Sequence, residues 1–513
     1  MKPHFVFGFV VAMFAFAFSP ADAQQPNIVF MLADDMGWNE PAFHGGDELL
    51  TPHMKRLAQS GVRLNQFYVH AVCAPTRAAF LTGRYAFRTW SDWRSEDYGK
   101  PSYLKKLGLT LAINEAGEET RRLQGLDTNE RTIAEALKDA GYFTSIIGKW
   151  HLGEWLPEHL PMGQGFDHQY GHYGWGIDYN NYTIPHNAPA RFAVYDWHRN
   201  QKPLFEQGYS TDLIANEAVR IIGQFSPEEG KTKKPFFIYV PFNAIHGPLE
   251  EIPRYRDKYE KRQAALKCLD DAIGRIVGAV QQNGLSKNTL IVFANDNGGL
   301  KPDQNAPYRG TKNTNYEGGV RVPCVFCWPE KLKPGSQNEE LMHIVDLFPT
   351  FSRLANASTK QERKLDGMDM TEVIFEGKSS KREEIVFEVS GSVRFPCIRK
   401  GNFKLVGKEL YDLKADPYEK TNIAAKHPEL VKSLSERVDW YGKQRPPLGK
   451  VERLMSPALP WVYGQQENEN APNWVKEVVQ KVRDTQPRQW AAGTTPWPQA
   501  PKDGVIIYSG DGR

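Results

Sequence analysis

Mostly apolar runs of strand length alternate with helical stretches along much of the chain. The runs cover residues 27–33, 142–147, 235–240 and 289–294. Helical periodicity marks residues 133–140 and 261–282. Continuous apolar strands separated by helices are typical of a parallel sheet that is covered on both faces. We therefore predict an α/β fold in which helices flank a mostly parallel sheet.

Polar side chains follow each of these predicted strands. They are Asp34 and Asp35 after the first, Lys149 and His151 after the second, Asn243 and His246 after the third, and Asp296 and Asn297 after the last. In open α/β sheets, ligands bind beyond the carboxyl ends of the strands. We therefore expect the four segments to bring these side chains to one crevice.

The acidic residues of this set are candidate metal ligands. Asp34 and Asp35 would repel each other unless a cation lies between them. Asp296 and Asn297 add further oxygen ligands, and a set of oxygens suits a hard cation such as Ca²⁺ or Mg²⁺. A solvated turn would explain Asp34-Asp35 alone, but Asp-Asn-Gly after a second strand favours a metal site.

The segment Cys73-Ala-Pro-Thr-Arg77, followed by Leu81-Thr-Gly-Arg84, is the most informative motif. A helix that begins near Pro75 would direct free N–H groups at Cys73 and form an anion-binding corner, to which Arg77 adds a cation. A free cysteine at the start of an ordinary helix is the alternative. The segment resembles the signature of type I sulfatases, Cys-x-Pro-Ser-Arg followed by Leu-Thr-Gly-Arg. Thr76 stands where the family usually has Ser, and it keeps the hydroxyl.

Further motifs extend the resemblance from Asn27 to near Trp440. They are Gly148-Lys-Trp-His-Leu-Gly153, Tyr308-Arg-Gly-Thr-Lys312, Tyr316-Glu-Gly-Gly-Val-Arg321, Gly401-Asn-Phe-Lys-Leu405, Glu409-Leu-Tyr-Asp-Leu413 and Asp416-Pro417. Within the family the chain is similar to the arylsulfatase B, or N-acetylgalactosamine-4-sulfatase, branch. Three segments carry that similarity: Asp34-Asp-Met-Gly-Trp-Asn39, residues 148–153 and His246-Gly-Pro-Leu249.

The resemblance implies a sulfuric ester hydrolase with an alkaline-phosphatase-like sheet and a smaller C-terminal antiparallel sheet plus helix. It implies that a separate maturation enzyme oxidises Cys73 to formylglycine, whose hydrate attacks sulfur. It also implies one Ca²⁺ ion, held by Asp34, Asp35, residue 73, Asp296 and Asn297. The substrate would be a sulfated carbohydrate or an aryl sulfate.

The resemblance also implies roles for the remaining polar residues. Arg77 and Lys149 would offset charge on the sulfuryl oxygens. His246 and Lys312 would protonate or stabilise the leaving oxygen, and His151 would take the proton of the second hydroxyl of the hydrate. An aldehyde matters because a plain Ser or Cys nucleophile would need water to attack sulfur in a second displacement.

Composition fits a large exported globular enzyme. The chain has 513 residues, of which 40% are hydrophobic and 24% charged. The formal net charge of +3 gives no argument for a nucleic-acid partner. The 13 tryptophans suit carbohydrate stacking, but they suit core packing equally well.

The N-terminus has the pattern of a secretory signal peptide. Residues 5–18 form an apolar run that is short for a bilayer span, and Ala21-Asp-Ala23 supplies a cleavage pattern. We expect a leader at 1–23, export, and no membrane span. We further expect a catalytic domain at 24–385, an α+β subdomain at 386–443 and a Pro/Trp-rich extension at 444–513, which could wrap the main domain or line a pocket. Residues 89–129 contain no convincing strand and are predicted to be a surface insertion.

Two other motifs are predicted to be structural. Cys324 and Cys327 have the spacing of a redox or zinc pair, but in a buried strand they would point to opposite faces. We therefore expect them to pack as small apolar residues. Asp270 and Asp271 lie inside the helical stretch 261–282, and we expect them on a solvated helix face.

Two other functions stay open at this point. A phosphoester hydrolase of the same superfamily would share the metal crevice, although such enzymes normally use Ser or Thr nucleophiles or a second metal. A non-catalytic protein that binds sulfated glycans would result if Cys73 were never modified. A purely structural protein would not explain polar groups that converge from four strand ends.

Overall fold

The computed structural model describes most of the chain. The described residues are 25–89, 109–113, 119–123, 126–153, 157–183, 195–226, 228, 231–389, 395–445 and 471–485. The predicted leader at 1–23 and most of the predicted extension at 444–513 lie outside them. Within the described residues, none of the helices combines the length and the apolar character needed to cross a bilayer.

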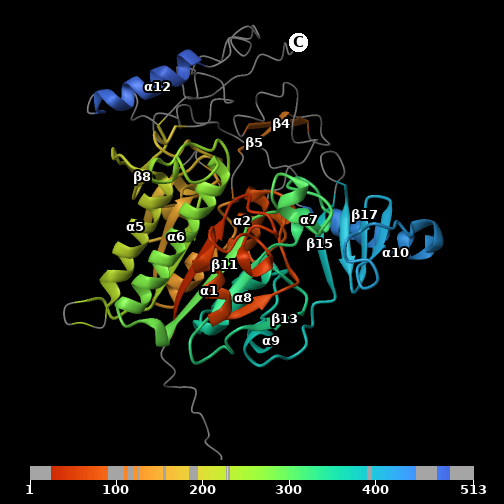
Figure 1. Cartoon of the computed structure of the whole chain (residues 1–513). Coiled ribbons are helices and arrows are strands. Elements are labelled where there is room, and N and C mark those ends of the chain that lie inside the picture. Colours follow the sequence, from red (N-terminus) through yellow and green to blue (C-terminus); the bar gives the residue numbers. More distant parts are fainter. Residues whose placement is uncertain are drawn as a thin grey trace, which may run out of the picture.

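A ten-stranded sheet forms the centre of the molecule (Figure 1). Its strand order is β13 (Ser336–Asn338), β2 (Val62–Leu64), β12 (Cys324–Cys327), β11 (Thr289–Asn295), β1 (Asn27–Ala33), β10 (Phe236–Pro241), β6 (Phe143–Lys149), β7 (His168–His172), β8 (His198–Arg199) and β9 (Lys202–Pro203). The five strands from β11 to β7 are mutually parallel. The predicted mostly parallel sheet is confirmed.

Helices cover both faces of this sheet because its strands are apolar on both sides. On β1, Ile28, Phe30 and Leu32 face one core, whereas the alternate residues face the other. The first core includes residues of α2 (Cys73–Thr82), α4 (Ile133–Asp139) and α8 (Leu347–Leu354). The second includes residues of α1 (Pro52–Ser60), α5 (Ser210–Ile222) and α6 (Lys261–Gln282). Cys324 and Cys327 also divide between the two cores and are free thiols, as predicted.

A four-stranded antiparallel sheet lies to one side of the main sheet (Figure 1). It consists of β15 (Glu384–Glu388), β16 (Cys397–Lys400), β17 (Phe403–Val406) and β18 (Glu409–Asp412), and α10 (Pro428–Gly442) contacts β16 and β17. The predicted C-terminal antiparallel sheet with a helix is confirmed. Smaller elements include β3 (Phe67–Tyr68), β14 (Met342–His343), α7 (Glu317–Val320) and α9 (Thr371–Phe375).

Two predictions about local structure are wrong. Within residues 89–129, β4 (Leu109–Ile113) and β5 (Glu119–Leu123) pair as an antiparallel hairpin. Asp270, which was expected on a solvated helix face, is fully buried. Its carboxylate accepts hydrogen bonds from the backbone N–H groups of His53 and Met54 at the start of α1. That contact joins residues more than 200 positions apart, so the helical pattern of α6 could not indicate it.

One helix of the predicted C-terminal extension packs against the second core of the main sheet. In α12 (Asn473–Thr485), Val475 and Val479 are buried in the second core. The ring of Trp474 meets that of Tyr195 at a centroid distance of 5.7 Å. Figure 1 shows α12 near β8, on the opposite side of the molecule from α10.

Candidate active site

The polar residues predicted from the strand ends meet around Cys73. Asp34 and Asp35 follow β1, Lys149 ends β6, and Asp296 and Asn297 follow β11. His246 follows β10, His151 follows β6, and Lys312 lies in the loop before α7. One side-chain donor atom of each of Asp34, Asp35, Cys73 and His246 lies within 4.8 Å of the others.

Cys73 occupies the first turn of α2. The helix begins at Cys73, two positions earlier than Pro75, where we expected it to start. The thiol is nearly inaccessible, and its Sγ lies 3.6 Å from Asp34 Oδ1. Thr76 fixes this turn, because its hydroxyl accepts from the His70 N–H (3.0 Å) and donates to the His70 carbonyl (3.1 Å). The hydroxyl that Thr76 shares with Ser therefore has a structural use.

Arg77 connects the ends of three strands. Its Nη2 donates to Asp34 Oδ2 (3.1 Å) and Asp296 Oδ2 (2.8 Å), and its Nη1 donates to the Lys149 carbonyl (3.0 Å). The side chain is fully buried. The resemblance implies that Arg77 offsets charge on the sulfuryl oxygens, and here its guanidinium donates to protein groups.

Two lysines face the paired carboxylates from opposite segments. Lys149 Nζ lies 2.6 Å from Asp34 Oδ2, and Lys312 Nζ lies 2.6 Å from Asp35 Oδ1. Burial alone would raise the pKa of Asp34, but the charges of Lys149, His246, Arg77 and Lys312 outweigh it and hold that pKa well below its usual range. Burial likewise opposes the charge on Lys312, yet the surrounding negative groups raise its pKa above the ordinary value. Both groups are therefore charged at neutral pH.

The oxygen donors have the chemistry of a hard-cation site. Oδ1 of Asp296 and Oδ1 of Asn297 are buried and have no hydrogen-bond partner in the described part of the chain. Buried polar atoms without a partner are rare. Asn297 Nδ2 donates to Asp35 Oδ1 (2.8 Å), which leaves the amide oxygen as the unused atom. Burial and the charge of Asp34 raise the pKa of Asp296, as expected for carboxylates that lack a cation between them.

The two histidines differ in their contacts. His246 Nδ1 lies 2.6 Å from the Gly247 carbonyl, which can only accept, so this nitrogen carries a hydrogen. Its Nε2 lies 3.7 Å from Asp35 Oδ2, and burial together with Lys149 and Lys312 lowers the pKa of the ring to about 4. His151 has a buried Nδ1 with no partner among the described residues. Burial and the charges of Lys149 and Arg77 lower its pKa well below the ordinary value.

This geometry agrees with comparison to known proteins. The family model "Sulfatase" matches residues 26–357, and "N-sulphoglucosamine sulphohydrolase, C-terminal" matches residues 311–444. The chain belongs to the type I sulfatase family. It is a sulfuric ester hydrolase with the sheet arrangement predicted for that family.

Relatives of this sulfatase include mouse enzymes. Mouse arylsulfatase J is 29% identical over 83% of this chain and 77% of its own sequence. Mouse N-acetylgalactosamine-6-sulfatase is 31% identical over 70% of this chain and 68% of its own. The arylsulfatase B branch stays a prediction.

Solved structures extend the comparison to the fold. Ps i-CgsB, crystallised with k-i-k-neocarrahexaose, is 25% identical with a TM-score of 0.69, and the match covers 91% of this chain and 99% of the other. The phosphonate monoester hydrolase of Agrobacterium radiobacter is 18% identical, with a TM-score of 0.55 over 82% of this chain and 96% of the other. That likeness shows a shared fold.

Two residues of the sulfatase site were missed from the sequence. Glu40 accepts from the Gly37 N–H (2.6 Å) and binds Arg262 through both carboxylate oxygens (2.7 and 2.8 Å). Arg262 Nη2 also donates to the Asp35 carbonyl (2.9 Å). Asp35 has a left-handed backbone with φ of 60°. The pair thus ties the acidic turn after β1 to the start of α6, a contact that no local pattern predicts.

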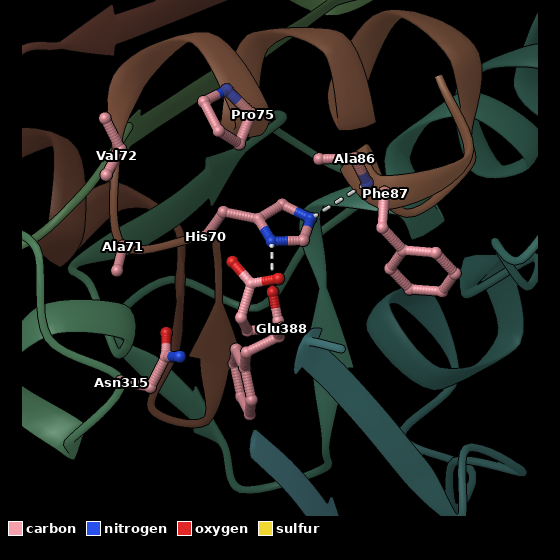
Figure 2. Close-up of a pocket in the computed structure, with 9 residues that line it drawn as sticks. His70, Ala71, Val72, Pro75, Ala86, Phe87, Asn315 and Glu388 are labelled. Atoms are coloured by element: carbon pink, nitrogen blue, oxygen red, sulfur yellow. Dashed lines mark hydrogen bonds between the residues drawn. The ribbon is translucent and has the colours of Figure 1, made fainter. Parts of the chain in front are cut away.

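A small pocket lies beside the first turn of α2 (Figure 2). Its wall includes Val72, Pro75, Asn315 and Glu388. His70 also lines the pocket. Its Nε2 accepts from the Ala86 N–H (3.3 Å), and its Nδ1 donates to the Phe387 carbonyl (3.1 Å). Because an N–H cannot accept and a carbonyl cannot donate, the ring is neutral. His70 therefore joins the segments on both sides of α2 to β15 of the C-terminal sheet.

Proposed function

We propose that this sulfatase hydrolyses sulfate esters of carbohydrates, with residue 73 as a formylglycine hydrate and one bound Ca²⁺. The observation that carries the proposal is the position of Cys73: its thiol faces Asp34, and Lys149, Lys312 and Arg77 surround the same carboxylates. Such a corner suits the tetrahedral, negatively charged sulfate group of an ester, because cations that are already fixed in place offset its charge without reorganising.

The environment of Cys73 supports modification rather than direct use of the thiol. Burial and the charge of Asp34 raise the pKa of the thiol to about 12. The thiolate is the nucleophilic form of cysteine, and it would be scarce here at neutral pH. A hydrated aldehyde offers a hydroxyl for attack on sulfur and a second hydroxyl whose loss of a proton expels sulfate.

Residues 34, 35, 73, 296 and 297 are proposed to hold the cation. The unpartnered oxygens of Asp296 and Asn297 support this assignment, as does a donor set dominated by carboxylates. When bound, the ion supplies positive charge to the sulfuryl group and lowers the pKa of a hydrate hydroxyl. The family resemblance favours Ca²⁺ over Mg²⁺.

The other residues are proposed to move or hold protons. Lys312 is charged and close to Asp35, so it can donate a proton to the leaving oxygen. His246 presents Nε2 to the same side and orients that oxygen once it is protonated. His151 is neutral because of its lowered pKa, so it can accept the proton of the second hydroxyl. Arg77 is proposed as a positioning residue, since its donors already bind Asp34, Asp296 and the Lys149 carbonyl.

Export, the maturation enzyme and the division of the chain are part of the same proposal. The leader at 1–23 would direct export, and a separate enzyme would oxidise Cys73. The catalytic domain is proposed to span 24–385, with the subdomain at 386–443 and the extension at 444–513.

The test compares sulfate and phosphate esters of one alcohol, with protein produced beside a formylglycine-generating enzyme. We expect turnover of the sulfate ester to exceed that of the phosphate ester by orders of magnitude. We expect Cys73→Ser to fold with an unchanged Tm but to lose essentially all turnover. Preference for the phosphate ester, or wild-type activity in Cys73→Ser with an unmodified serine, would overturn the proposal.

A further inference from the structure

The half-buried Trp175 lies at the rim of the active site, against His246. The indole and imidazole ring centroids are 5.7 Å apart, with the ring planes inclined at 69°. At that angle the imidazole does not stack over the indole face. Most other residues of the site are nearly inaccessible, whereas Trp175 and the segment from His246 to Glu250 keep partial exposure.

The segment that carries Trp175 is fixed by hydrogen bonds to buried groups. The buried carboxylate of Asp196 accepts from the backbone N–H groups of Tyr173 (3.0 Å) and Gly174 (2.7 Å). The buried hydroxyl of Tyr179 lies 2.8 Å from the His246 carbonyl and 3.1 Å from that of Asn243. Trp175 and His246 therefore belong to one wall whose parts are fixed to each other.

Among the described residues, the indole N–H of Trp175 has no hydrogen-bond partner. The N–H groups of Trp150, Trp197 and Trp328 each donate to a carbonyl or carboxylate. No hydrogen bond is formed by the indole N–H of Trp175 within the described part of the chain. Tryptophans that combine an apolar ring with a free N–H are suited to ligands that are apolar on one face and polar at the edge. A sugar ring has this character, because its C–H face is apolar and its hydroxyls project from the rim.

The position of the sugar ring is set by the position of the leaving oxygen of the ester. That oxygen must come close to His246 and Lys312, and it is attached to the sugar. The sugar ring is then beside His246 on the open side of the site, where Trp175 stands. We propose that Trp175 is a carbohydrate-binding residue on which the sulfated sugar ring lies during hydrolysis. The inference rests on the proposed function and names the surface that its substrate contacts.

The test measures binding, so that it does not depend on turnover. Cys73→Ala protein and Cys73→Ala/Trp175→Ala protein are titrated by calorimetry with N-acetylgalactosamine 4-sulfate and 6-sulfate, and separately with inorganic sulfate. Of the two sugar sulfates, we consider the one that Cys73→Ala protein binds more tightly. We expect the double variant to bind it about tenfold more weakly, because one aromatic contact is lost. The dissociation constant for inorganic sulfate should stay within about twofold of the parent value. Trp175→Phe should recover most of the sugar affinity.

A matched control separates this role from loss of folding. Trp440 is 48% exposed on α10, a helix that Figure 1 shows at the edge of the molecule, away from α2, and Trp440→Ala should change neither constant. Equal sugar affinity with and without Trp175 would overturn the inference. An equal loss of affinity for the sugar sulfate and for inorganic sulfate would overturn it too, because Trp175 would then act by holding the sulfate-binding residues in place. Failure of the proposed function would instead appear as wild-type protein that cleaves no sulfate ester.

Discussion

The basic side chains around residue 73 differ in their access to substrate. The side chains of Arg77 and Lys149 are fully buried, whereas those of Lys312 and His246 are 10% and 15% exposed. The first two can act on substrate only through the field they create or through the groups they hold. Lys312 and His246 lie where an entering ester would first meet the protein, which agrees with their proposed place beside the leaving oxygen.

Leaving-group chemistry tests that division of roles. A sugar alkoxide needs a proton to leave, whereas an activated aryl oxide does not. Lys312→Ala and His246→Ala should therefore lower kcat for a sugar sulfate by about 10²–10⁴-fold and by much less for a nitrophenyl sulfate. Steady-state kinetics on both substrates provide the measurement. Equal losses would indicate that these residues bind the sulfuryl group.

A second prediction at residue scale concerns the cation. Asp296→Asn removes a charged oxygen, so Ca²⁺ affinity should fall by about tenfold or more and activity should fall with it. Calcium titration followed by Tm and by turnover measures both. Asp303→Asn, at an exposed position nearby, should leave both unchanged. Full activity of chelator-treated wild-type protein would exclude a functional metal.

At the scale of elements, the apolar periodicity was enough to predict four of the five parallel strands, and the polar residues that follow them indicated which side chains would converge. The prediction for β1 matches the structure at both ends, and that for α6 does as well. Patterns of this kind report burial of local segments. They carry no information on contacts between distant segments, which is why Arg262 beside Asp35 and Asp270 beneath α1 were missed. The hairpin of β4 and β5 was missed because β5 is mostly polar and each strand is only five residues long.

The contact between α6 and the turn after β1 makes a specific prediction. Arg262→Met breaks the bonds to Glu40 and the Asp35 carbonyl, so the acidic turn should lose its fixed position. We expect Ca²⁺ affinity to fall about 10–100-fold, the usual effect of losing a residue that orients metal ligands. Isothermal titration provides the measurement. Arg256→Met, which breaks only an exposed ion pair with Glu251, is the control and should have no effect.

At the scale of the molecule, a buried ionic cluster joins the C-terminal sheet to α7. Lys404 of β17 lies 2.8 Å from Glu317 of α7 and 3.0 Å from Glu419, and all three are fully buried. Glu419 also accepts from the Glu317 N–H (2.6 Å). Because α7 follows the loop with Lys312, the C-terminal sheet helps to hold one edge of the site.

Removing the cation of this cluster should destabilise the whole chain. Lys404→Met removes the buried ammonium that pairs with both Glu317 and Glu419, which should cost about 3–5 kcal/mol of unfolding free energy. Chemical denaturation measures the change. Lys400→Met, at an exposed end of β16, should stay within about 0.5 kcal/mol of wild type. A similar small change in Lys404→Met would show that the cluster does not hold the C-terminal sheet to α7.

The chemical state of residue 73 in active protein is the most direct test of the mechanism. Samples with different degrees of maturation are digested, the peptide that contains residue 73 is weighed by mass spectrometry, and sulfate ester turnover is measured on the same samples. Turnover should rise in proportion to the fraction of peptide that carries an aldehyde in place of the thiol, and it should vanish where only cysteine is found. Full turnover in a sample whose residue 73 is entirely unmodified cysteine would contradict the aldehyde mechanism.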